Sequence, residues 1–150
     1  MGRLKPSLFD DNANCKPESI NDFYKTSKYL VNFIESKNTK VNYPSHNLDT
    51  AFDVTFGDSG PLVVLCVEYD ALPEIGHACG HNIIATASIG AGLGLQDLAN
   101  DLDIRVKLLG TPAEEGGGGK IILLDNGAFE DAKCSMMIHP AYENVVNPTF

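Results

Sequence analysis

The sequence predicts an α/β fold, in which a mainly parallel sheet carries helices on both faces. Short aliphatic segments alternate along the chain with segments of helical periodicity, as in folds that cross over between parallel strands. One aliphatic segment, residues 61–67 (PLVVLCV), is a continuous apolar run, which is typical of a strand buried on both faces. Polar motifs follow directly on the expected strands. The 150 residues suffice for one domain with a single hydrophobic core.

The first half of the chain predicts a helix followed by two strands. Residues 1–17 are polar and irregular, and we expect a loose N-terminal segment there. Apolar residues recur at helical spacing over residues 18–37, which predicts an amphipathic helix. Apolar and polar residues alternate over 51–56, as in a strand at a sheet edge. The buried strand over 61–67 follows after a glycine-rich turn.

The second half continues the alternation of helices and strands. Residues 82–99 predict a helix whose several glycines favour close packing against a neighbouring element. A second buried strand is expected over 104–109. A short helix over 119–126 should end at Gly127, and a third strand is expected over 134–138.

The composition excludes several classes of function. Twenty acidic residues against eleven basic ones give a net charge of −9, which disfavours binding to nucleic acid. No apolar run has the length of a membrane span, and the first ten residues lack the apolar stretch of a signal peptide. We therefore expect a cytoplasmic protein whose four cysteines are thiols or metal ligands rather than disulfides.

Three polar motifs follow the three buried strands. Asp70 lies in the motif after the first, residues 110–115 (GTPAEE) follow the second, and His139 follows the third. In open α/β sheets, ligands bind outside the carboxyl ends of the strands, so these motifs should converge on one edge.

A fourth motif precedes the long helix and contains Cys79 and His81. Together with His139 and a carboxylate from Glu114 or Glu115, these side chains form a donor set that suits zinc or a similar divalent ion. One of the two glutamates can hold the metal, while its neighbour takes a proton from the metal-bound water.

Each motif alone also has an ordinary structural interpretation. A Cys-X-His segment is more often incidental than metal-binding, adjacent glutamates usually lie on a solvated surface, and Asp70 could be a turn residue. His77 could bind metal or orient the loop. Two glycine-rich segments, 90–94 and 116–120, resemble nucleotide-binding loops, but the first lies within a helical pattern and the second lacks the required residues.

The motifs together resemble the amidohydrolase branch of the aminoacylase and carboxypeptidase metallopeptidases, peptidase family M-twenty. Within this branch the sequence most resembles the eukaryotic, dipeptidase-like peptidase M-twenty domain-containing protein two group. The segments that carry the resemblance occur in this order: 68–73, 76–82, 110–115, 117–120 and 139–140.

The resemblance implies roles for six residues. Cys79, His81, Glu115 and His139 would match metal ligands of a centre with two divalent ions, and zinc is favoured over manganese or cobalt because Cys79 is a soft ligand. Glu114 would match the general base. Asp70 would match a carboxylate that orients a metal-binding histidine in related enzymes, although Glu68 stands where those relatives have that histidine.

The resemblance also implies an activity and a domain organisation. It predicts metal-dependent hydrolysis of an amide bond in dipeptides or N-acyl amino acids, with a small-molecule substrate and no nucleic-acid or membrane partner. Residues 18–150 would form the N-terminal part of the catalytic domain. Family members continue with an inserted domain for dimerisation and substrate covering, and with a last metal-binding histidine, which this chain does not contain. The alternative is a non-catalytic metal-binding or interaction fragment.

Overall fold

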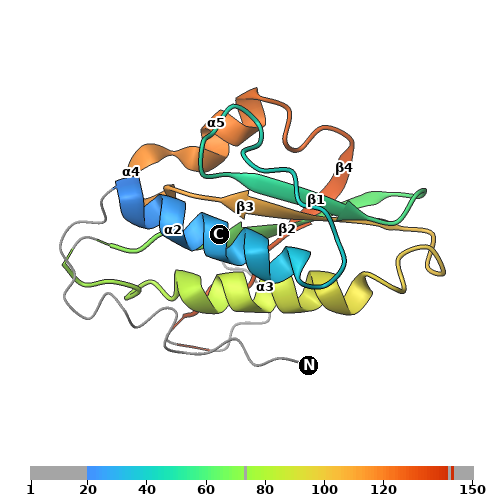
Figure 1. Ribbon diagram of the computed structural model, residues 1–150, viewed down its shortest axis with the longest axis horizontal. Coiled ribbons are helices and arrows are strands. Elements are labelled where there is room, and N and C mark those ends of the chain that lie inside the picture. Colours follow the sequence, from blue (N-terminus) through green and yellow to red (C-terminus); the bar gives the residue numbers. More distant parts are fainter. Residues whose placement is uncertain (1–19, 73, 142, 144–150) are drawn as a thin grey trace.

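The computed structural model describes residues 20–72, 74–141 and 143, and it shows one mixed sheet with helices on both faces (Figure 1). The N-terminal segment expected over residues 1–17 lies outside the described residues. The sheet has the strand order β1-β3-β2-β4. Strand β2 runs parallel to both β3 and β4, while β1 is antiparallel to β3, so the mainly parallel sheet is confirmed. The strands are β1 (Phe52–Phe56), β2 (Leu62–Glu68), β3 (Arg105–Thr111) and β4 (Ala132–Met136).

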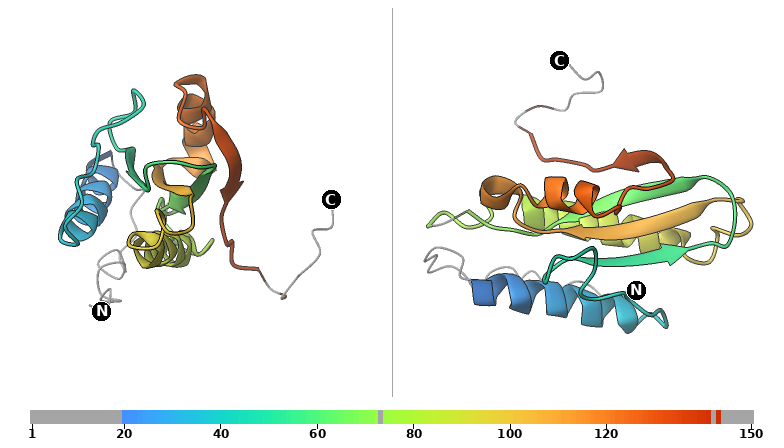
Figure 2. Two further views of the ribbon diagram at one scale, coloured as in Figure 1. Left: turned by 90° about the vertical axis from the view of Figure 1, so that its right-hand side faces the viewer. Right: turned by 90° about the horizontal axis from the view of Figure 1, so that it is seen from above.

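The helices cover the two faces of the sheet unequally. Helices α2 and α3 lie on one side and α5 lies on the other (Figure 2). A one-turn helix, α4, which the sequence analysis did not predict, lies between β3 and α5. Their bounds are α2 (Ile20–Glu35), α3 (His81–Leu95), α4 (Glu114–Gly117) and α5 (Gly119–Asp125).

Strand β2 forms the centre of the hydrophobic core and contributes to both faces, as its unbroken apolar sequence predicts. Leu65 and Val67 pack in the cluster that includes side chains of α2, α3 and β1. Val64 and Cys66 pack in a second cluster with Leu123 of α5. Because side chains alternate along a strand, this single segment joins the two layers of helices to the sheet.

Strand β4 has a different environment from the other strands. It begins two residues earlier than expected, and it pairs with β2 alone among the elements that the structure describes. Its residues 133–136 are exposed, and so are Met137 and Ile138 beyond it. The apolar sequence predicted the strand correctly, but within the described residues no element covers its outer side.

The helices are too short or too polar to cross a membrane. Over the described ranges, none is both long enough and apolar enough to span a bilayer.

Candidate metal centre

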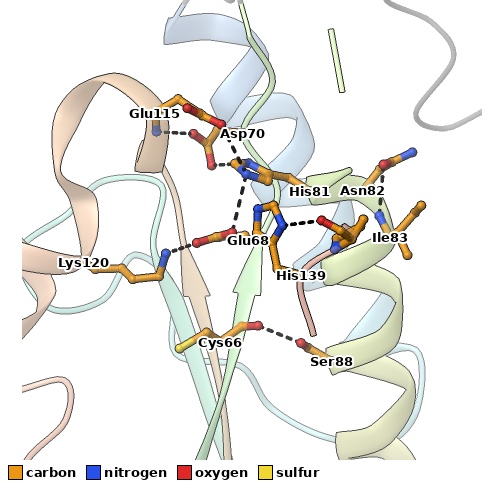
Figure 3. Close-up of polar contacts among 11 residues, drawn as sticks. Cys66, Glu68, Asp70, His81, Asn82, Ile83, Ser88, Glu115, Lys120 and His139 are labelled. Atoms are coloured by element: carbon orange, nitrogen blue, oxygen red, sulfur yellow. Dashed lines mark hydrogen bonds and ion pairs between the residues drawn. The ribbon is translucent and has the colours of Figure 1, made fainter. Parts of the chain in front are cut away.

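Polar side chains from four segments of the chain meet at the carboxyl ends of β2 and β3. Figure 3 shows Glu68 at the end of β2, Asp70 just beyond it and His81 at the start of α3. Glu115 of α4 and His139 of the segment after β4 complete the group. The structure thus brings together residues that are up to about 70 positions apart in sequence.

His81 lies at the centre of this group with 1% of its surface exposed. Its Nδ1 is 3.2 Å from Oδ1 of Asp70. A carboxylate oxygen can only accept, so Nδ1 carries the hydrogen and the neutral ring presents a lone pair at Nε2. Within the described part of the chain Nε2 has no hydrogen-bond partner, although it is buried.

The surroundings of Nε2 favour a cation. Its lone pair lies 3.5 Å from Oε2 of Glu68 and 3.6 Å from Oε1 of Glu115. Three acceptor atoms therefore face one another, and they repel unless a proton or a metal ion lies between them. Adjacent nitrogen and oxygen ligands of a tetrahedral zinc ion are about 3.3 Å apart, from the usual bond lengths. The observed separations fit such an ion.

Asp70 fixes two of these groups at once. While Oδ1 accepts from the His81 ring, Oδ2 accepts from the backbone N–H of Glu115 at 3.1 Å. Asp70 itself is 2% exposed. A buried carboxylate thus couples the start of α3 to the start of α4. Carboxylates that orient a histidine in this way are common next to metal ligands.

Cys79 belongs to one of two groups of side chains whose donor atoms could hold an ion. Cys79, His81 and Glu115 have donor atoms within 4.8 Å of one another. The hydrogen bond to Glu115, reinforced by burial and the negative charges of Glu115, Glu114 and Asp70, raises the pKa of the Cys79 thiol. A divalent cation would reverse this effect, because it stabilises the thiolate.

The second group consists of Glu68, His81 and His139, again with donor atoms within 4.8 Å. The two imidazole rings meet edge to face, with centroids 5.8 Å apart and an angle of 82° between the planes. Nδ1 of His139 is 2.8 Å from the carbonyl oxygen of Pro140, to which it donates, and this leaves Nε2 of His139 as a free donor to metal.

Two glycines permit the close approach of these segments. Gly80, at φ +77°, would place a Cβ 2.6 Å from Cγ of Pro140, so only glycine lets the His139 segment lie against the start of α3. Gly119 would place a Cβ 1.8 Å from the carbonyl oxygen of Pro112. Glycine there lets α5 start beside the end of β3, which brings Lys120 to the site.

Lys120 and Glu68 form an ion pair that the sequence analysis missed (Figure 3). Glu68 is 1% exposed, and burial lowers the pKa of Lys120. A glutamate at the end of an apolar strand signals a buried charge that needs a partner. The sequence does not identify that partner, because Lys120 lies 52 residues away behind a run of glycines.

Two further residues of the motifs lie around this cluster. His77 is in neither group of candidate ligands among the described residues. Its pKa is lowered by burial first and then by the nearby His81. Glu114 is exposed at the start of α4, and its charge is one of those that raise the pKa of Cys79. The carboxylate of Glu114 thus lies within electrostatic range of the candidate ligands.

The sequence has relatives of known activity, although no family model matches it. It is 40% identical to the Xaa-Arg dipeptidase of Mus musculus, over 85% of this chain and 33% of the relative. It is 38% identical to the Xaa-Arg dipeptidase of Homo sapiens, over 86% and 34%. It is 29% identical to a p-aminobenzoyl-glutamate hydrolase polypeptide of Escherichia coli, over 83% and 30%. The chain thus spans about one third of the length of these relatives.

The fold agrees with these relatives. A Bacillus subtilis protein described as a dinuclear metal binding peptidase from the M20 family superposes with a TM-score of 0.67. The similarity covers 86% of this chain and 40% of that protein, at 18% sequence identity. The resemblance carried by the motifs is confirmed, and the chain is related to the metallopeptidases of the M20 family.

Proposed function

We propose that this protein hydrolyses the amide bond of dipeptides or N-acyl amino acids with a metal-activated water molecule. The observation that carries the proposal is the unpartnered Nε2 of buried His81, which faces the carboxylates of Glu68 and Glu115. The hydrolase relatives support the same chemistry.

The proposed metal centre holds two divalent ions, with zinc as the first choice. Cys79, His81, Glu115 and His139 are the proposed ligands, and the two overlapping groups of donor atoms support more than one ion position. When bound, the metal supplies positive charge that lowers the pKa of water toward neutrality and polarises the amide carbonyl. The thiolate of Cys79 favours zinc over harder ions.

The side chains of this chain move the protons and orient the ligands. Glu114 is the proposed general base: its carboxylate takes a proton from the attacking water and returns it to the leaving amine. Its exposed position at the start of α4 leaves it open to solvent and substrate. Asp70 is a positioning residue, because it holds the His81 ring and the backbone of Glu115.

The substrate class is proposed from the relatives. Two of them are named Xaa-Arg dipeptidases, so dipeptides that end in arginine are the first substrates to test. The acidic net charge of this chain is compatible with a cationic product. We further propose that residues 18–150 form the N-terminal part of the catalytic domain, that the complete protein dimerises through another domain, and that it is cytoplasmic.

The test is hydrolysis of Xaa-Arg and N-acyl substrates by the purified protein, followed as release of the free amino acid. We expect a chelator to abolish turnover and Glu114→Gln to reduce it by about 10²- to 10⁴-fold while zinc remains bound. Glu130→Gln is the control, because Glu130 is exposed and lies outside both groups of candidate ligands. Activity that survives both treatments would show that the mechanism is wrong. Zinc binding without turnover would support the non-catalytic metal-binding alternative.

A further inference from the structure

We propose that Glu68 is an additional protein ligand of the metal centre, through its Oε2 atom. The inference rests on the proposed metal centre and extends it to a residue outside the four proposed ligands. Glu68 ends β2 and is 1% exposed, so its carboxylate is held at the base of the site rather than in solvent.

The two oxygens of Glu68 have different surroundings. Oε1 accepts from the ammonium group of Lys120. Oε2 is buried and has no hydrogen-bond partner among the described residues. It lies 3.5 Å from Nε2 of His81, which is also buried and unpartnered. A buried acceptor left unsatisfied costs about 1–3 kcal/mol, and more when it is charged. Two such acceptors facing each other indicate a shared ligand.

His139 completes the position that these atoms define. Glu68, His81 and His139 each offer one donor atom, and these atoms lie within 4.8 Å of one another. The three residues come from β2, from α3 and from the segment after β4 (Figure 3). A divalent cation at this position satisfies both the carboxylate oxygen and the imidazole nitrogen.

The ion pair with Lys120 is compatible with this role. Lys120 approaches from α5 and binds the oxygen that the metal does not use. It neutralises one of the negative charges gathered here, which besides Glu68 are those of Asp70, Glu114 and Glu115. If Glu68 served only as the partner of Lys120, both residues would contribute to stability alone, and neither would affect metal affinity.

The experiment compares zinc affinity in four forms of the full chain, measured by competition with a chromophoric chelator. These are the unmodified chain, Glu68→Gln, Lys120→Met and the double variant. We expect Glu68→Gln to weaken zinc binding at least tenfold, because it removes a charged ligand. We expect Lys120→Met not to weaken it, because the lost cation repelled the metal. The visible spectrum of bound Co²⁺ should change in Glu68→Gln and stay unchanged in Lys120→Met.

The double variant covers the case in which Glu68→Gln alone does not fold. It leaves no buried charge without a partner, which is the main cost of breaking such a pair. We expect it to fold and to bind zinc at least tenfold more weakly than the unmodified chain. Unchanged affinity in Glu68→Gln or in the double variant overturns the inference and leaves the proposed function intact. An equal loss in Lys120→Met and Glu68→Gln overturns it as well. A failure of the unmodified chain to bind zinc would contradict both proposals.

Discussion

His81 shows how a single side chain gathers the candidate site. One ring nitrogen is bound by Asp70, so the other must point at Glu68 and Glu115. The sequence motif indicated His81 and Asp70 as partners in one site. It could not indicate that Glu68 would be buried beside them, because that depends on the ion pair with Lys120, which only the folded chain forms.

Asp70→Asn tests whether His81 must be held in one tautomer. The amide can donate to Nδ1, which would allow the hydrogen to move to Nε2 and block metal binding. We expect zinc affinity to fall by about 10- to 100-fold, as for other residues that orient metal ligands. Isothermal titration of zinc into the two chains would measure the difference.

Asp58→Asn is the matched control for that substitution. Asp58 is exposed and accepts a hydrogen bond from the Asn100 side chain at 3.0 Å, in a turn that contributes to neither group of candidate ligands. Its substitution should leave zinc affinity unchanged. If Asp70→Asn also binds zinc normally, Asp70 does not position His81 for metal.

The cysteines should differ in reactivity according to their burial. Burial raises the pKa of the Cys66 thiol, while Cys134 is exposed on β4. A raised pKa means less thiolate at a given pH, and thiolate is the reactive form. At pH 8 we expect iodoacetamide to label Cys134 in the native chain and Cys66 only after unfolding, as measured by peptide mass spectrometry. Equal labelling rates would contradict the burial of β2.

At the scale of elements, the periodicity predicted the helices and strands well but their environments less well. The apolar run of β2 predicted burial on both faces, and β1 lies at the sheet edge as its alternating sequence indicated. Helix α4 was missed because four residues, two of them glycines, are too short and too flexible to give a helical pattern. The exposure of β4 was missed because apolar sequence predicts a strand, not its neighbours.

Helix α3 offers a matched pair of glycines that tests its packing. A Cβ at Gly92 would lie 2.5 Å from Cδ2 of Leu108, whereas a Cβ at Gly90 would meet nothing within 4 Å. We expect Gly92→Ala to lower the free energy of unfolding by about 1–3 kcal/mol through overpacking. Gly90→Ala should raise it by up to about 1 kcal/mol, since alanine favours the helix. Urea denaturation measures both, and equal effects would mean that α3 does not pack closely on β3.

At the scale of the whole molecule, the outer side of β4 is the most exposed apolar surface of the sheet. Met136 is 57% exposed and Ile138 is 73% exposed. An uncovered edge strand with apolar side chains is prone to pair with another chain. The sequence indicated this hazard only through the resemblance to longer proteins, because a strand pattern does not show which edge remains open.

We therefore expect the purified chain to associate as its concentration rises, and Met136→Lys to reduce that association. Sedimentation velocity over a range of concentrations measures the effect. Thr55→Lys on β1 is the control, because it adds the same charge at an exposed position of the opposite edge strand. An equal reduction in both variants would show that β4 is not the contact.

The measurement that tests the central claim most directly is the zinc content of the chain after equilibrium dialysis, determined by elemental mass spectrometry. The account predicts stoichiometric zinc, up to two ions for the two groups of donor atoms. It also predicts loss of that zinc in His81→Ala and retention in His46→Ala, because His46 lies apart from the site, near Asp53. A chain that binds no zinc, or that keeps its zinc in His81→Ala, would contradict the assignment of this cluster as a metal centre.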